Sequence, residues 1–144
     1  MIKSLNTGKT FCKESQLLAP VATFARQKGF CMQMEEMPFY EYRIDLYGFS
    51  PRKDVTVAFE LKMNDWRRAL QQAVLYQICS DLVYIAMPER AAQRVDRVAL
   101  EKYGIGLIAV LNSGSCRCMI KAAEHTEVRE FYRGSHISYL KDSR

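Results

Sequence analysis

Apolar residues follow a helical spacing near the start of the chain. Within residues 13–28, "KESQLLAPVATFARQK", they recur at Leu17, Leu18, Val21, Phe24 and Ala25. This spacing places one apolar stripe along a helix. Pro20 lies inside the pattern and predicts either a kink or a late helix start, because its ring clashes with the preceding turn. Gly29 follows the pattern and is a typical helix-ending residue.

Three extended segments come next, and they predict an antiparallel meander. The segments are residues 30–36, 42–49 and 55–62, and the turn-forming stretch "SPRKD" (50–54) separates the last two. The alternation in 42–49 is the clearest of the three. It puts Ile44 and Leu46 on one face and Asp45, Tyr47 and Phe49 on the other.

The second half of the chain alternates helical and buried-strand patterns. Asp65 is a natural N-cap for a helix over residues 66–79. After it we expect a strand over 82–88, a helix over 89–103, a strand over 105–111, a short strand near 117–121 and then some helix. The continuous apolar run of 105–111 is typical of parallel pairing. This order predicts an α/β fold in which helices flank a mixed central β-sheet.

The composition fits a single domain over residues 1–144. The chain is 49% hydrophobic and 26% charged, and 144 residues are enough to bury a core. The net charge of +5 fits a polyanionic partner without requiring one. No apolar run reaches the roughly 18–20 residues that a membrane helix needs, and "MIKSLNTGKT" lacks the apolar segment of a signal peptide. We therefore expect a cytoplasmic protein that does not contact membranes.

The five cysteines do not have the pattern of a disulfide framework. Their number is odd and they are scattered through hydrophobic contexts, so we expect reduced, mostly buried thiols. Cys116 and Cys118 are separated by one residue, which is not the spacing of a zinc knuckle. A metal site that combines them with His125 is the alternative.

Two charged residues close the third predicted strand, "VTVAFELK". Glu60 and Lys62 are two positions apart and share the strand face of the small Ala58. A hairpin closed through 50–54 also brings Asp45 close to Glu60. Two carboxylates and an ammonium are costly to bury without a compensating ion. Mg²⁺ meets this need, because it takes one or two protein carboxylates and keeps water and phosphate oxygens as its other ligands. For Glu60 and Lys62 alone, an ordinary surface ion pair is the alternative.

The helix after this strand carries a polar stripe. Arg68, Gln72 and Tyr76 are spaced by four and lie beside the apolar face of the helix. A guanidinium, an amide and a phenol in a row can hold a phosphodiester backbone, and the phenol ring can stack on a base. A solvated helix flank is the alternative for these residues, and plain surface is the alternative for the neighbouring Arg67.

Together these motifs resemble the PD-(D/E)XK nuclease superfamily, in the subgroup with a Q-x-x-x-Y motif. The matching residues are Glu14 on the first helix, Asp45 in "RID", Glu60 and Lys62 in "ELK", and Gln72 and Tyr76 in "QAVLY". Ile44 stands where the family often has proline. The resemblance covers roughly residues 10–111, and it implies a restriction-endonuclease-like αβββαβ core with an extra helix and strand, followed by a C-terminal extension over 112–144.

The resemblance also implies a role for each of these side chains. Asp45, Glu60 and the backbone carbonyl of Leu61 would hold Mg²⁺, with Mn²⁺ as a substitute. Lys62 would assist the attacking water. Glu14 would be a further ligand, direct or through water, and its alternative is a solvated carboxylate in the first helical turn. Gln72 and Tyr76 would complete the catalytic set.

The expected function is therefore Mg²⁺-dependent hydrolysis of phosphodiester bonds in DNA. The chain would act as a homodimer or as part of a larger nucleic-acid-processing assembly. A catalytically inactive nucleic-acid-binding or assembly module of the same fold is the first alternative. A structural protein whose charged strand end is only an ion-pair cluster is the second. RNA in place of DNA, and endonuclease or exonuclease action, all remain compatible with these motifs.

Overall fold

A computed structural model describes residues 10–124 and 130–143 of the chain. Its centre is a six-stranded mixed sheet in which the strands follow one another in chain order. The strands are β1 (Met32–Phe39), β2 (Tyr42–Ser50), β3 (Val55–Leu61), β4 (Leu82–Pro88), β5 (Gly106–Val110) and β6 (Cys116–Ile120). Strands β1 to β3 form the expected antiparallel meander, β3, β4 and β5 are parallel, and β6 is antiparallel to β5.

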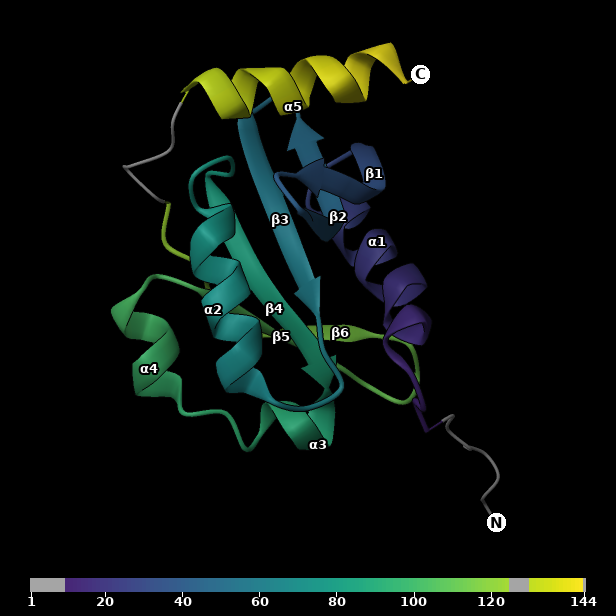
Figure 1. The fold of residues 1–144 in the computed structure, drawn as a ribbon. Coiled ribbons are helices and arrows are strands. Elements are labelled where there is room, and N and C mark those ends of the chain that lie inside the picture. Colours follow the sequence, from purple (N-terminus) through teal and green to yellow (C-terminus); the bar gives the residue numbers. More distant parts are fainter. Residues whose placement is uncertain (1–9, 125–129, 144) are drawn as a thin grey trace.

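Helices cover both faces of this sheet, so the predicted α/β fold class is confirmed (Figure 1). They are η2 (Glu14–Leu17), α1 (Leu18–Gln27), α2 (Trp66–Tyr76), α3 (Glu89–Ala92), α4 (Arg97–Lys102) and α5 (Glu130–Asp142). Pro20 falls in the first turn of α1, where no backbone N–H is required, so the late helix start is confirmed. Within the described residues, no helix combines the length and apolar character that a membrane span needs.

The sheet separates two apolar cores. One core packs α2, α4 and α5 against the face of β3 that carries Ala58. The other packs η2 and α1 against the opposite face, through side chains such as Leu17, Val21 and Phe59. Because both faces are covered, the charged ends of the central strands lie between two packed layers.

The helix predicted over 89–103 is wrong as one continuous element. The chain forms α3 and α4 with a break between them. Asp96 has an extended backbone, and its carboxylate accepts a hydrogen bond from the N–H of Val98. An aspartate in this position starts a new helix because it satisfies an N–H that lacks an intrahelical partner.

The alternation of side chains shifts by one residue midway along β1 and β2. Glu36 and Asp45 lie opposite each other but unpaired, and Glu36 has a left-handed backbone with φ of 52°. On β2, Ile44 and Tyr47 contact the same core although an odd spacing normally sends residues to opposite faces. The prediction that Ile44 and Leu46 share a face is therefore wrong, since Leu46 belongs to the other core.

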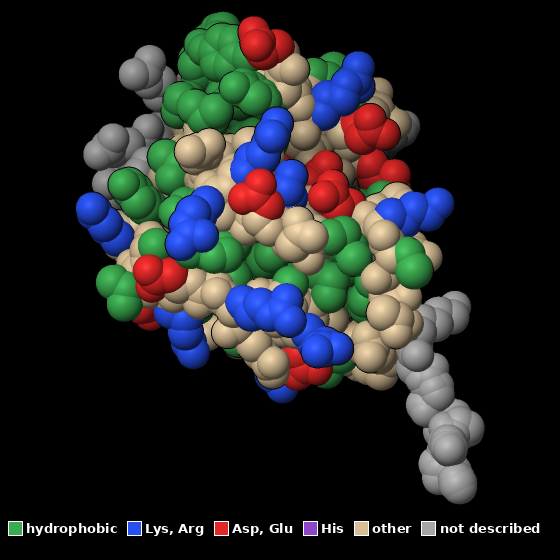
Figure 2. All heavy atoms as spheres, turned by 60° about the horizontal axis from the view of Figure 1, so that its bottom comes forward, with side chains coloured by type: hydrophobic (Ala, Val, Ile, Leu, Met, Phe, Trp, Pro, Cys, Tyr) green, Lys and Arg blue, Asp and Glu red, His purple; other side chains and the backbone are tan. Residues whose placement is uncertain are grey.

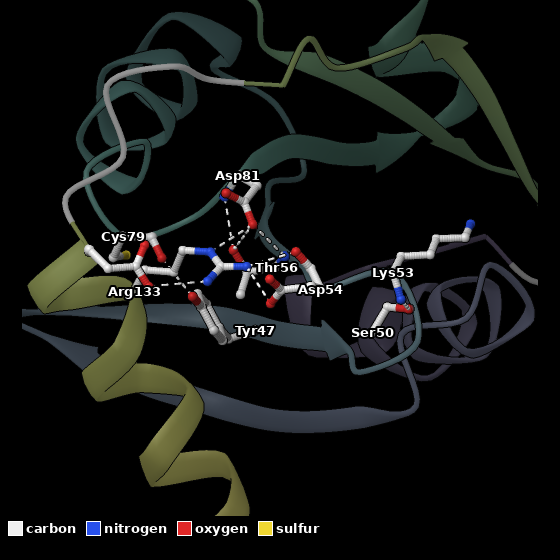
Figure 3. Close-up of polar contacts among 9 residues, drawn as sticks. Tyr47, Ser50, Lys53, Asp54, Thr56, Cys79, Asp81 and Arg133 are labelled. Carbon is white, nitrogen blue, oxygen red and sulfur yellow. Dashed lines mark hydrogen bonds and ion pairs between the residues drawn. The ribbon is translucent and has the colours of Figure 1, made fainter.

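A buried polar network attaches α5 to the start of β3 (Figure 3). Nε of Arg133 donates to Asp81 at 2.9 Å, and its Nη2 donates to the side chain of Asp54, also at 2.9 Å. The Asp81 carboxylate also accepts hydrogen bonds from the backbone N–H and the hydroxyl of Thr56. Figure 1 shows α5 lying across this end of the sheet. Other side chains occupy the opposite end of the sheet, where β3 and β4 finish.

Candidate active site

The first half of β2 and the end of β3 bring Asp45 and Glu60 together. Backbone pairing of the two strands ends at Leu46 opposite Phe59, and Asp45 and Glu60 are the next residues on each strand. Beyond this point a side chain supplies the hydrogen-bond acceptor that the backbone would otherwise supply. Oδ2 of Asp45 accepts a hydrogen bond of 2.8 Å from the backbone N–H of Leu61. The backbone pairing of the two strands therefore ends at Asp45, and its carboxylate takes over the contact with β3.

Glu60 is buried, with only 6% of its surface exposed. Its Oε1 accepts a hydrogen bond of 3.2 Å from the Tyr76 hydroxyl of α2. The same hydroxyl lies 3.5 Å from the backbone carbonyl of Arg43 on β2. Tyr76 thus connects α2 to both strands that supply the acids.

Burial raises the pKa of both carboxyl groups. Desolvation is the main cause for Glu60, the negative charge of Asp45 adds to it, and together they raise the pKa of Glu60 from 4.5 to about 8. The pKa of Asp45 is also raised, mainly by desolvation, against the lowering effect of its hydrogen bond from Leu61. Carboxyls held this way favour either a proton or a cation between them.

Three more charged residues surround this pair. Lys62 is half-buried and its charge lowers the pKa of both carboxyls, whereas Glu14 on η2 raises both. Glu36 on β1 raises the pKa of Asp45 alone. In Figure 2, where this end of the molecule is turned forward, acidic and basic side chains lie side by side.

The carboxylates of Asp45 and Glu60 fit a hard divalent cation that takes few ligands from the protein. Within the described residues, neither Oδ1 of Asp45 nor Oε2 of Glu60 has a hydrogen-bond partner, so one oxygen of each remains available. No group of three His, Cys, Asp or Glu side chains in the described part of the chain is arranged to hold a metal. Glu14 is therefore placed as an outer charge, and the pair suits Mg²⁺, which completes its shell with water, carbonyl and phosphate oxygens.

The polar stripe of α2 divides into an exposed and a buried part. Arg68 is exposed and Gln72 is half-buried, while Tyr76 is buried with 1% of its surface exposed. The ring of Tyr76 packs edge-on against Phe39 in the core. The prediction that this ring stacks on a base is therefore wrong, because the hydrophobic effect has placed it inside. Arg67 is exposed, and its guanidinium lies 4.5 Å from the centre of the Trp66 ring.

The cysteines take no part in this site. All five are free, but Cys79 alone is buried, so the prediction of mostly buried thiols is wrong. Cys116 and Cys118 lie on β6, an edge strand whose outer positions stay open to solvent. His125, the third residue of the alternative metal site, lies outside the described residues.

Sequence reasoning gave Glu36 no place in the candidate site. Glu36 carries a detectable signal, since the adjacent acids in "QMEEMPF" break the alternation of β1.

Comparison with known proteins shows the fold of this chain but does not show a family. No protein-family model matches the chain, and no curated protein matches it. A solved protein of unknown function from Silicibacter pomeroyi is similar, with a TM-score of 0.69 over 93% of this chain and 88% of that chain, at 20% sequence identity. The similarity shows the fold, an α/β architecture built on a mixed six-stranded sheet.

Proposed function

We propose that this protein is a metal-dependent nuclease of the PD-(D/E)XK type that hydrolyses phosphodiester bonds in DNA. The observation that carries the proposal is the juxtaposition of Asp45, Glu60 and Lys62 where β2 and β3 separate. Two carboxyls with raised pKa values beside an ammonium are expensive to bury in a site that has only a structural role.

Each residue of the proposed site has its own role in the reaction. Asp45 and Glu60 would hold Mg²⁺, or Mn²⁺ in its place, with the Leu61 carbonyl as a further ligand. The ion supplies charge neutralisation and a more acidic bound water. Lys62 orients the attacking water and stabilises the negative charge that grows on the phosphate oxygens. Tyr76 fixes the Glu60 carboxylate through its 3.2 Å hydrogen bond and so acts as a positioning residue.

A catalytically inactive module of the same fold is the second candidate. The observation in its favour is that, among the described residues, no third carboxylate or imidazole joins the pair closely enough to form a three-residue metal site. Such a module would still bind nucleic acid through Arg67 and Arg68, which are exposed on α2.

A cleavage assay separates the two candidates. The wild-type chain is incubated with linear, nicked and branched DNA across a range of Mg²⁺ and Mn²⁺ concentrations, beside Lys62→Ala and Asp45→Asn. We expect metal-dependent cleavage by the wild type and a loss of roughly 100-fold or more in both variants, because Lys62→Ala removes the group that assists the attacking water and Asp45→Asn removes a charged metal ligand. Lys102→Ala, an exposed change on α4, is the control and should cut normally.

Two results would contradict the proposal. Binding of DNA without cleavage of any substrate would favour the inactive module. Cleavage that survives unchanged in both Lys62→Ala and Asp45→Asn would remove these residues from the active site.

A further inference from the structure

A groove of about 670 Å³ lies beside the end of α1, on the sheet face opposite to the one that carries Glu60. Its lining comes from α1, the turn before β3, the strands β3 and β4, and the end of β6. The volume falls within the range of roughly 300–1,000 Å³ in which proteins bind small ligands. Because volume alone identifies no ligand, the chemistry of the lining has to indicate what the groove binds.

The floor of the groove is an apolar sheet face that α1 covers only in part. β3 and β4 are parallel strands, and sheets of such strands are normally covered by helices on both faces. Val55, Leu82 and Tyr84 of these strands nevertheless remain half-buried, as does Phe24 of α1, although all four pack against the core of this face. An apolar group seated here would therefore remove further apolar surface from water, which is favourable.

The described lining offers few hydrogen-bonding groups to a polar ligand. Apart from charged side chains, its polar side-chain groups are the hydroxyl of Tyr84 and the thiol of Cys118, and it contains no amide, serine or threonine. A sugar or a nucleobase would lose its hydrogen bonds to water on entry, and few protein groups would replace them. The lining therefore favours a ligand with an apolar body.

Three lysines from separate segments surround this apolar floor. Lys28 follows α1, Lys53 lies in the turn before β3, and Lys121 follows β6. All three are exposed, and none forms an ion pair within the described residues. Asp54, the neighbour of Lys53, is paired with Arg133 instead, and Figure 3 shows the Lys53 side chain extending away from that pair.

The lining as a whole carries an excess of positive charge. Glu124 is its one acidic residue within the described part of the chain, against the three lysines. Exposed lysines are common and by themselves indicate no ligand. Here they converge from three segments on one groove whose floor is apolar, and this combination matches a molecule with an apolar body and an anionic head.

We propose that this groove binds a small amphipathic anion. Its apolar body would lie against Phe24, Leu82 and Tyr84, and its carboxylate or phosphate head would lie among the three lysines at the rim. This binding goes beyond the nuclease function and does not depend on it, because the groove and the acids of the candidate active site lie on different faces of the sheet.

Isothermal titration calorimetry of the wild-type chain tests the proposal with decanoate and decyl phosphate, each below its micelle concentration. Decanol, which has the same chain without a charge, is the neutral reference. We expect saturable one-to-one binding of at least one anion and weaker binding of decanol. Lys28→Met/Lys53→Met/Lys121→Met keeps the aliphatic stems and should weaken anion binding roughly tenfold, the scale of several exposed ion pairs. Decanol binding should not change.

Two further variants separate charge from apolar contact. Arg90, Lys102 and Lys141 are exposed and lie outside the groove, so Arg90→Met/Lys102→Met/Lys141→Met removes the same charge and should bind the anions as wild type does. Phe24→Gln replaces an apolar wall by an amide, and it should weaken the binding of anions and decanol alike.

Cys118 reports whether the ligand occupies this groove. Its thiol is exposed in the lining, whereas Cys12 is exposed outside it. Bound decanoate or decyl phosphate should slow the alkylation of Cys118 by iodoacetamide and leave that of Cys12 unchanged. Mass spectrometry of the digested chain follows both cysteines in one sample.

Four results would overturn the proposal. They are no saturable binding of either anion, binding of decanol as tight as that of the anions, equal losses in the two triple variants, and unchanged alkylation of Cys118 at saturation. The wild-type cleavage assay decides the nuclease proposal separately, since it uses neither these anions nor the residues of the groove.

Discussion

Glu60 lowers the stability of the folded chain when it is charged, although its side chain is fixed in one position by burial and a hydrogen bond. Its carboxyl is buried beside Asp45, and the hydrogen bond from Tyr76 only partly compensates for the lost hydration. A protein without use for two adjacent carboxylates would be more stable with a neutral side chain at one position. Burial with a raised pKa therefore favours a functional role for this pair.

Replacement of Glu60 should reveal this cost as a change in pH dependence. The folded pKa of about 8 lies above the unfolded value of 4.5, so its contribution to stability is full below pH 4.5 and is lost as pH rises through 8. Glu60→Gln should remove that loss and make the metal-free protein more stable than wild type at pH 9, by on the order of a few kcal/mol. Urea denaturation at pH 5 and pH 9 in a chelator measures the effect.

Glu101→Gln serves as a matched control for the same measurement. Glu101 is an exposed residue of α4, so this change should leave the pH dependence as it is in wild type. If Glu60→Gln is no more stable than wild type at pH 9, the pKa of Glu60 is not raised in the folded protein.

At the scale of elements, local irregularities decide where the functional groups lie. The shift in alternation at Glu36 and Asp45 ends the pairing of β2 with β3 and leaves the Asp45 carboxylate as the acceptor for Leu61. The sequence pattern predicted the hairpin but assumed regular alternation throughout. A left-handed Glu36 could not be foreseen, because glycine is the usual residue in that conformation.

Besides its apolar contacts, the helix α5 is attached to the rest of the chain through one buried arginine. Arg133 is paired with Asp81, and both side chains are almost fully buried. Arg133→Met keeps the aliphatic stem but leaves Asp81 without its cation, which should lower the free energy of unfolding by roughly 3–5 kcal/mol. Thermal and urea denaturation of the full chain measure the loss.

The exposed members of the same network provide the comparison. The Glu130 side chain is 80% exposed, so Glu130→Gln should cost no more than about 1 kcal/mol. The double variant Arg133→Met/Asp81→Asn should recover part of the loss, because it removes the unpaired charge. Equal effects of Arg133→Met and Glu130→Gln would show that burial of the pair contributes nothing.

At the scale of the whole molecule, the two ends of the mixed sheet carry different groups of residues. The end where β3 begins is attached to α5 through the Arg133 network, whereas the end where β3 and β4 finish carries the acids and Lys62. In α/β proteins, ligands commonly bind at the carboxyl ends of parallel strands. The packed layers on both faces of the sheet surround the charged groups of that end.

Mg²⁺ should therefore stabilise the whole chain, and more strongly at high pH. Only the charged carboxylates bind the ion, so its effect should grow as pH rises through the pKa of Glu60, about 8. At a concentration about tenfold above Kd, a site on the folded state adds about 1.4 kcal/mol. Thermal melts at pH 6 and pH 9, with NaCl at matched ionic strength as the control, measure this effect. Equal Mg²⁺ stabilisation in Asp45→Asn/Glu60→Gln would place the ion elsewhere.

The sequence by itself determined the elements whose signals are local. Apolar spacing identified α1, α2 and the strands, Asp65 marked the start of α2, and the turn at 50–54 brought Asp45 near Glu60. These features follow from periodicity and capping, which act over a few residues.

Only the tertiary structure decided how the candidate site is built. It buried Tyr76 and turned its hydroxyl to Glu60, and it placed Glu36 in a left-handed conformation. Each of these depends on contacts between residues far apart in the chain. The apolar spacing within α2 selects the face that goes inside, but the pairing of β1, β2 and β3 decides which groups Tyr76 meets there.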